Sequence, residues 1–312
     1  AAPGKGWHKS SEGSEWIITK AKQQSDQPLW ILVWGGLEDI AQALHDAPEI
    51  ESKIRVYWIG GPNKKWSVNS YLYIAQNFPD LWMIEANSTY RGWFIDDDSK
   101  PKINNDNFYK DMVKDKGAFG TDFGNYYKGS IKMGDTPSVA YLLHGDANHP
   151  QETSWGGSFD QLPYSAYRLY NRNTSTSDTI PTYSLIEWKF DIEEPLENES
   201  SEIWIKIDGQ RIDGFYEGNG TFRIRFVPKR IGNWKYTVNC TSDKLHGNTG
   251  EFVSANPWPG VEHPDNINLN NWWSDRTDKD LYLGQYQGAK TVSKWREDYL
   301  MDWAERFKWL DQ

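Results

Sequence analysis

Two apolar runs near the start of the chain end in the same way. Leu29–Val33 leads into Trp34, Gly35 and Gly36, and Ile54–Ile59 leads into a second Gly pair. A continuous apolar run is typical of a parallel strand buried on both faces. Between the runs, apolar residues recur at helical spacing, so the segment predicts a βαβ unit; they are Ile40, Ala43, Leu44 and Ala47.

The Gly pairs have two interpretations. In open α/β sheets, ligands bind beyond the carboxyl ends of the parallel strands, where a Gly lets backbone atoms approach a ligand closely. The pairs then mark a binding crevice. Alternatively, they only serve tight turns between strand and helix. The pattern alone leaves both open.

Helical and strand patterns alternate further along the chain. Helices are expected near 68–76, 107–114 and 137–143, and a strand near 81–85. This alternation predicts an α/β fold, a parallel sheet with helices on both faces.

The pattern becomes β-rich after a polar stretch that begins at Asn171. Short runs of alternating residues follow, clearest in Phe222–Phe226, and predict a small β-sandwich. Ala289–Leu310 then carries one apolar helical face, which needs a partner to be buried. The chain is therefore predicted to form a discontinuous α/β domain, 1–170 with 256–312, and an inserted β-sandwich, 171–255.

Composition excludes several classes of function. The net charge is −10 and no Lys/Arg cluster stands out, which disfavours nucleic-acid binding. No apolar run approaches the length of a membrane span. Cys240 is the single cysteine, so neither an internal disulfide nor a cysteine metal cage can form. Aromatic residues make up 15% of the chain, so exposed rings that suit sugar faces or protein partners are expected.

The order of several motifs resembles one known family. "SSEGSEWII", "PLWILVWGG", "GDTPSVAYLL", "WGGSF" and "AKTVSKWREDYLMDWAERFKW" together look like a secreted, cellulose-binding family with a nucleoside-hydrolase-like domain. The likeness covers about 7–160 and 285–310. "GFYEGNGTFRIRFVPKRIGNWKYTV" resembles Ig-like modules that accompany glycoside hydrolases.

The resemblance gives the glycines a possible role. Nucleoside hydrolases hold Ca²⁺ with Asp carboxylates and one backbone carbonyl, and the matching positions here are Asp135 and Trp34. Such oxygen ligands suit Ca²⁺, whose bound water attacks the anomeric carbon. A Glu-x-Asn pair that grips ribose falls near Ser67 and Asn69, which leaves Asn69 as the candidate.

The chain departs from that family at decisive positions. The Asp-rich motif of the family's first strand is absent, and the run Asp96-Asp97-Asp98 is expected to be a solvated loop. The His before the late Asp is Gly134. Ca²⁺ is thus possible, no cofactor is certain, and the catalytic residues are unknown. A companion chain or another segment would have to complete the sheet.

The remaining candidates are aromatic or acidic. Trp155, Trp272 and Trp273 are expected either to form an aromatic platform at the crevice mouth or, for Trp155, to cap the core. Asp39 lies beyond the first predicted strand. The predicted ligand-binding set is Trp34, Gly35, Gly36, Asp39, Asn69, Trp155, Trp272 and Trp273.

Three hypotheses remain open. The first is a secreted protein that binds a cellulose-like polysaccharide or oligosaccharide through aromatic residues at the carboxyl edge of the sheet. The second is a Ca²⁺-dependent glycosidic or N-ribosidic hydrolase. The third is an extracellular structural or assembly subunit, for which a homo-oligomer is one arrangement. Five N-x-[ST] sequons hint at a secretory route; they lie at Asn87, Asn173, Asn198, Asn219 and Asn239.

Overall fold

The computed structural model describes residues 9–95, 105–126, 132–192 and 202–311. The predicted Asp96-Asp97-Asp98 loop and the Asn198 sequon lie outside these ranges. The chain divides into two compact units, 1–85 with 161–273, and 86–160 with 274–312. The predicted domain boundaries, 1–170 with 256–312 and 171–255, differ from this division and stay a prediction.

The first unit opens with the predicted βαβ unit. Strands β1 (Leu29–Val33) and β2 (Ile54–Ile59) pair in parallel, and α2 (Glu38–Asp46) connects them. In the sheet the strand order is β1-β2-β3-β16-β4, with β3 at Trp82–Ala86 and β16 at Trp272–Asp275. Strand β4 spans Phe159–Gln161.

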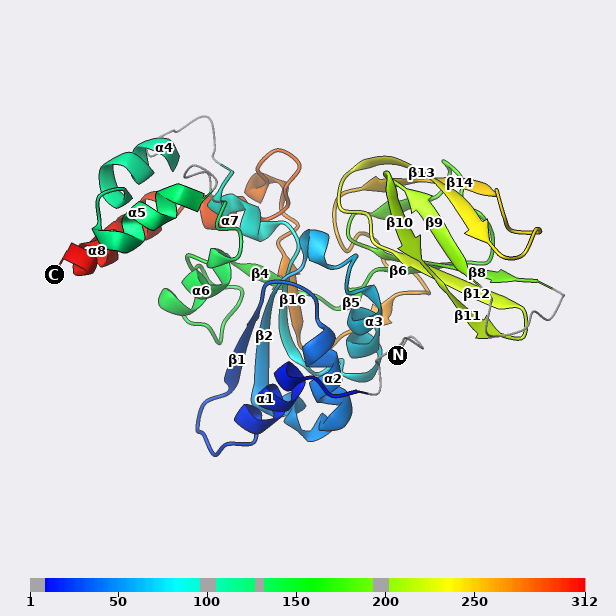
Figure 1. The fold of residues 1–312 in the computed structure, drawn as a ribbon, viewed down its shortest axis with the longest axis horizontal. Helices are drawn as coiled ribbons and strands as arrows, with labels where there is room; N and C mark the ends of the chain where they lie inside the picture. Colours follow the sequence, from blue (N-terminus) through cyan, green and yellow to red (C-terminus); the bar gives the residue numbers. More distant parts are fainter. Residues whose placement is uncertain (1–8, 96–104, 127–131, 193–201, 312) are drawn as a thin grey trace. The chain divides into compact units, whose positions relative to one another are not determined.

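Helices cover one face of this sheet. Figure 1 shows α1 (Glu12–Ala21), α2 and α3 (Val68–Asn77) gathered beside β1 and β2. Alternate strand residues such as Val56 and Met83 point into this core, which they share with Leu44 of α2. Short 3₁₀ helices η1 (Pro48–Lys53) and η2 (Gly61–Asn63) complete the connections.

The β-rich part of the first unit forms a sandwich, as predicted. Its two main sheets have the orders β10-β9-β13-β14-β7 and β11-β12-β8-β6. Side chains from both sheets, among them Trp188 and Phe252, share one buried core. The sandwich strands are β6 (Tyr167–Tyr170), β7 (Thr179–Pro181), β8 (Leu185–Asp191), β9 (Ile203–Ile207), β10 (Gln210–Asp213), β11 (Phe215–Gly218), β12 (Thr221–Phe226), β13 (Gly232–Cys240) and β14 (Thr249–Ala255). Strands β5 (Tyr164–Ser165) and β15 (Ile267–Asn268) pair with each other in a separate two-stranded sheet.

The second unit is mainly helical. Its core joins Trp93 to the apolar face predicted within 289–310, and Trp93 stacks on Tyr299 at 3.8 Å between ring centroids. That face belongs to two helices, α7 (Lys290–Ser293) and α8 (Arg296–Phe307), rather than one. The other helices are η3 (Thr89–Trp93), α4 (Asn105–Phe108), the π-helix η4 (Tyr109–Val113), α5 (Gly117–Asn125), α6 (Thr136–Leu143), η6 (Lys279–Leu281) and η7 (Lys308–Asp311).

Candidate functional site

The loops after β1 and β2 form the candidate site at the carboxyl edge of the sheet. Side chains tie the two loops together through backbone carbonyls. Trp58 Nε1 donates to the Gly35 carbonyl at 2.8 Å. Asn63 Nδ2 donates to the Ile59 carbonyl at 2.9 Å and to the Trp34 carbonyl at 3.4 Å. The predicted juxtaposition of the two glycine-bearing loops is therefore present.

The glycines of the two loops have different roles. Gly61 has a φ of +38°, which an L side chain rarely adopts. Gly35 and Gly36 have no positive φ, and a Cβ at Gly35 would meet nothing within 4 Å. A Cβ at Gly36 would meet only the flexible Glu38 carboxylate. Gly61 thus adopts the positive φ that its turn requires, whereas Gly35 stands beside open space.

Two tryptophans at this edge have large exposed areas. Trp34 follows β1 and is 53% exposed, and Trp66 follows η2 and is 64% exposed. Both connect to Asn63, because its side chain reaches the Trp34 carbonyl and its own carbonyl accepts the Trp66 N–H at 3.0 Å. Trp66 was not among the predicted ligand-binding residues. Its position between a Gly-Pro turn and a helix, where no core-facing stripe continues, was the available signal.

A lysine lies beside the Trp66 ring and connects it to an amide. Lys65 Nζ lies 4.1 Å from the centre of the Trp66 ring and bonds to Gln210 Oε1 at 2.7 Å. Burial lowers the pKa of the Lys65 ammonium, and the positive charge of Lys229 lowers it further. The edge therefore combines exposed rings with a cation and amides, the groups that recognise a sugar's C–H face and its hydroxyls.

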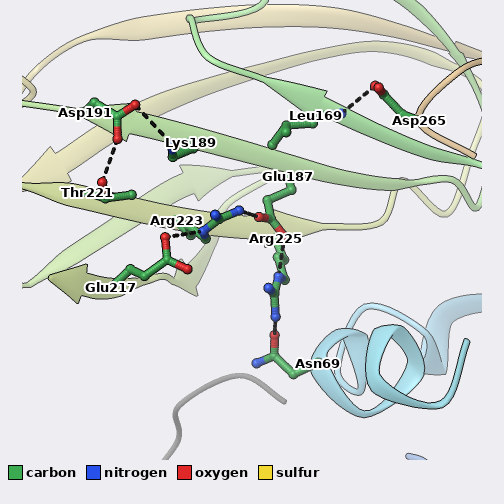
Figure 2. Close-up of polar contacts among 10 residues, drawn as sticks. All are labelled: Asn69, Leu169, Glu187, Lys189, Asp191, Glu217, Thr221, Arg223, Arg225 and Asp265. Carbon is green, nitrogen blue, oxygen red and sulfur yellow. Dashed lines mark hydrogen bonds and ion pairs between the residues drawn. The ribbon is translucent and has the colours of Figure 1, made fainter. Parts of the chain in front are cut away.

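Asn69, predicted to bind ribose, contacts the sandwich. Figure 2 shows its Oδ1 accepting a hydrogen bond from Arg225 Nη1, at 2.8 Å. Arg225 also binds Glu187, a carboxylate that is 1% exposed and pairs with Arg223 as well. Burial and the Glu187 charge raise the pKa of the neighbouring Tyr167 phenol. The outer face of β8 and β12 thus meets α3 through a charged layer.

A cluster of polar side chains is buried in the first unit. Lys64 Nζ contacts Glu85 Oε1 at 2.6 Å, and both side chains are fully buried. Tyr71 donates to Glu85 Oε2 at 2.8 Å and also contacts Ser165 Oγ at 2.6 Å. The Lys64 ammonium lies over the rings of Tyr71 and Trp258. This cluster links Lys64, which follows β2, to Glu85 on β3 and Tyr71 on α3.

The structure corrects one aromatic prediction and relocates others. Trp272 is 0% exposed and packs edge-on against Tyr71, with ring centroids 5.8 Å apart, because its strand position points it toward α3. It therefore cannot belong to an exposed platform. Trp273, the next residue, points to the opposite face and packs on Trp82 at 4.8 Å. Trp155, in the second unit, stacks on His144 at 4.9 Å.

The two predicted carboxylates, Asp39 and Asp135, lie in different surroundings. Asp39 accepts a hydrogen bond from Ser11 Oγ at 2.5 Å, next to the start of α1. Asp135, at the start of α6, is half-buried, and burial raises the pKa of its carboxyl. No group of three or more His, Cys, Asp or Glu side chains that could hold a metal ion occurs in the described residues. Asp135 is therefore not part of such a group within the described ranges, and a Ca²⁺ site at Trp34 and Asp135 stays a prediction.

Comparisons with known proteins match both parts of the chain. The family model described as "Cellulose-binding Sde182, nucleoside hydrolase-like domain" matches residues 1–159. A model for a domain of unknown function, DUF5060, matches residues 179–241. None of the curated proteins matches the chain.

Among the solved structures similar to this chain are two bacterial proteins. A candidate glycoside hydrolase from Bacteroides vulgatus is 23% identical over 25% of this chain and 16% of its own, with a TM-score of 0.23. A nucleoside hydrolase-related protein from Saccharophagus degradans, associated with carbohydrate metabolism, is 15% identical over 78% of this chain and 75% of its own, with a TM-score of 0.36. The chain thus spans less than a fifth of the first of these proteins.

Proposed function

Because the chain belongs to the family of cellulose-binding Sde182 proteins with a nucleoside hydrolase-like domain, we propose that it binds a cellulose-like polysaccharide or oligosaccharide through aromatic residues at the carboxyl edge of its sheet. The observation that carries the proposal is the exposure of Trp34 and Trp66, 53% and 64%, on adjacent loops joined through Asn63. Exposed apolar side chains on neighbouring loops point to a ligand-binding surface when they form one patch.

The open space at Gly35 supports the same proposal. A side chain at this position would stand beside Trp34, so glycine keeps the backbone accessible there. Lys65 and Gln210 add polar groups next to Trp66. A sugar ring would place its C–H face on an indole and its hydroxyls toward these groups.

A binding assay tests this role directly. The intact protein is titrated with soluble cello-oligosaccharides in a calorimeter and pulled down with microcrystalline cellulose. Trp34→Ala and Trp66→Ala should each weaken binding by about tenfold, equivalent to about 1.4 kcal/mol. Trp16→Ala is the matched control, since Trp16 is 61% exposed but lies on α1. If both edge variants bind as well as the wild type, the proposed site is wrong.

Extracellular location is a second part of the proposal. Among the described residues, no helix is long and apolar enough to cross a membrane. Of the sequons, Asn219 is exposed, whereas Asn87 is fully buried and unsuited to modification. Mass spectrometry of peptides from the native host, before and after glycosidase treatment, tests whether Asn219 carries a glycan.

A further inference from the structure

A pocket of about 930 Å³ lies at the amino ends of β1 and β2, the ends opposite to Trp34 and Trp66. Residues 20–29 and the start of β2 line it. This volume lies within the range of small-molecule sites. The pocket is cationic although the whole chain has a net charge of −10. Its lining carries four basic side chains and a single carboxylate, Asp26; the basic residues are Lys20, Lys22, Lys53 and Arg55.

Part of this positive charge has no ion-pair partner within the described ranges of the chain. Lys22 forms an exposed ion pair with Glu49 at 2.7 Å. Lys20 lies 4.5 Å from the centre of the Trp16 ring, and neither Lys20 nor Lys53 forms an ion pair with any residue that the structure describes. A cluster of cations around one cavity raises the local concentration of an anionic ligand.

An aromatic row adjoins the pocket through Arg55. Arg55 stands opposite Trp30 in the parallel register of β1 and β2. Its guanidinium lies 5.7 Å from the centre of the Trp30 ring and 5.1 Å from that of Trp82. Trp82 in turn packs on Trp273 at 4.8 Å. The row therefore crosses β1, β2, β3 and β16 on the face opposite α2 and α3, and both of its outer rings are partly exposed.

The geometry of the row argues against a flat polysaccharide surface. The Trp30 and Trp82 planes meet at 77°, and those of Trp82 and Trp273 at 40°. Crystalline cellulose would need coplanar rings, whereas a flexible soluble chain can contact tilted ones. The rest of the pocket lining offers amides and hydroxyls, which pair with sugar hydroxyls; they are Gln23, Gln24, Gln27, Ser25 and Ser52.

From these three features we propose a second binding site, for an anionic oligosaccharide with uronic acid units. Lys20, Lys53 and Arg55 face the carboxylates, the amides face the hydroxyls, and Trp30 and Trp273 take the sugar C–H faces. This site shares no residue with the Trp34 and Trp66 edge, so either site can fail without the other. An acidic peptide would satisfy the cations but would not use the amides of the lining and the adjoining indoles as fully.

Calorimetric titration of the full chain with oligogalacturonate tests the site, using cello-oligosaccharide of equal length and polyglutamate as comparison ligands. Lys20→Gln with Lys53→Gln should weaken oligogalacturonate binding at least about tenfold and leave cello-oligosaccharide binding unchanged. Lys20→Arg with Lys53→Arg should keep the affinity, because it keeps the charge. Lys206→Gln, an exposed lysine on β9, should have no effect. Added salt should weaken binding, as screening predicts.

Two results would overturn the assignment. If oligogalacturonate does not bind, or binds equally well to the double Gln variant, the pocket is not its site. If polyglutamate binds as tightly as oligogalacturonate, the pocket takes acidic peptides instead. Melting temperatures of all variants control for folding, and the Arg variant separates loss of charge from loss of structure.

Discussion

Lys64 Nζ lies 2.6 Å from Glu85 Oε1, and neither side chain has any exposed surface. Removing one member of such a pair leaves the other charge buried without compensation, which costs about 3–5 kcal/mol. Glu85→Gln should therefore lower the free energy of unfolding by about this amount, measured by urea denaturation. Lys64→Met combined with Glu85→Leu removes both charges and should cost less than Glu85→Gln alone. Equal stability of Glu85→Gln and the wild type would show that the pair is not buried in solution.

Tyr71 makes the protein sensitive to alkaline pH. Burial and the Glu85 charge raise the pKa of its phenol well above the ordinary value of 10.0. Above pH 10 the phenol loses its proton only in the unfolded chain, so stability is complete below pH 10 and falls as pH rises toward the raised pKa. This one group should contribute about 1.4 kcal/mol per pH unit. Tyr71→Phe should flatten the alkaline slope of unfolding free energy by that amount; an unchanged slope would contradict the burial of the phenol.

The glycines predict opposite responses to the same substitution. Gly61→Ala should destabilise the protein by about 1–2 kcal/mol, because its φ of +38° is strained for any residue with a Cβ. Gly35→Ala should be tolerated, since its Cβ would meet nothing within 4 Å. Chemical denaturation of the two variants gives the comparison. A larger loss of unfolding free energy for Gly35→Ala than for Gly61→Ala would contradict the roles given to these two glycines.

The charged contacts of Arg225 between α3 and β12 should stabilise the fold. Arg225→Gln removes hydrogen bonds to Glu187 and Asn69, and bonds to charged groups contribute about 1.5–3 kcal/mol. Arg211→Gln is the control, because Arg211 pairs with Asp213 on an exposed surface, where such a pair contributes less than about 1 kcal/mol. Comparable losses in the two variants would indicate that the layer does not hold α3 against the sandwich.

Local patterns predicted most of the elements. The apolar runs of β1 and β2 and the alternation in β12 report burial directly, and the structure confirms all three strands. The break between α7 and α8 was not predicted, because no Gly or Pro interrupts the apolar face near Lys294. The parallel sheet and the added sandwich were recognisable from sequence; the pairing partners of β16 were not, since long-range pairing leaves no local signal.

The candidate site was predictable only in part. Trp34 and the glycines follow a strand, which the sequence indicates by itself. The placement of Trp272 and Trp273 depends on which face of β16 meets α3, and a two-residue alternation does not specify that face. Trp66 lies in a short connection without helical or strand periodicity, so its place between a Gly-Pro turn and a helix was the one local signal of its exposure. The cationic pocket gathers lysines from the end of α1 and the end of η1, about 30 residues apart, and no cluster of them appears in the sequence.

The position of β16 between β3 and β4 affects how the chain is made. Both neighbours of β16 are synthesised long before it, and the sandwich is translated in between. During translation, the edges of β3 and β4 that pair with β16 therefore stay unpaired while β6–β14 emerge and pair. A chaperone that covers these waiting strand edges would raise the yield of native protein, whereas premature release before residue 275 would leave a sheet with a gap at its centre.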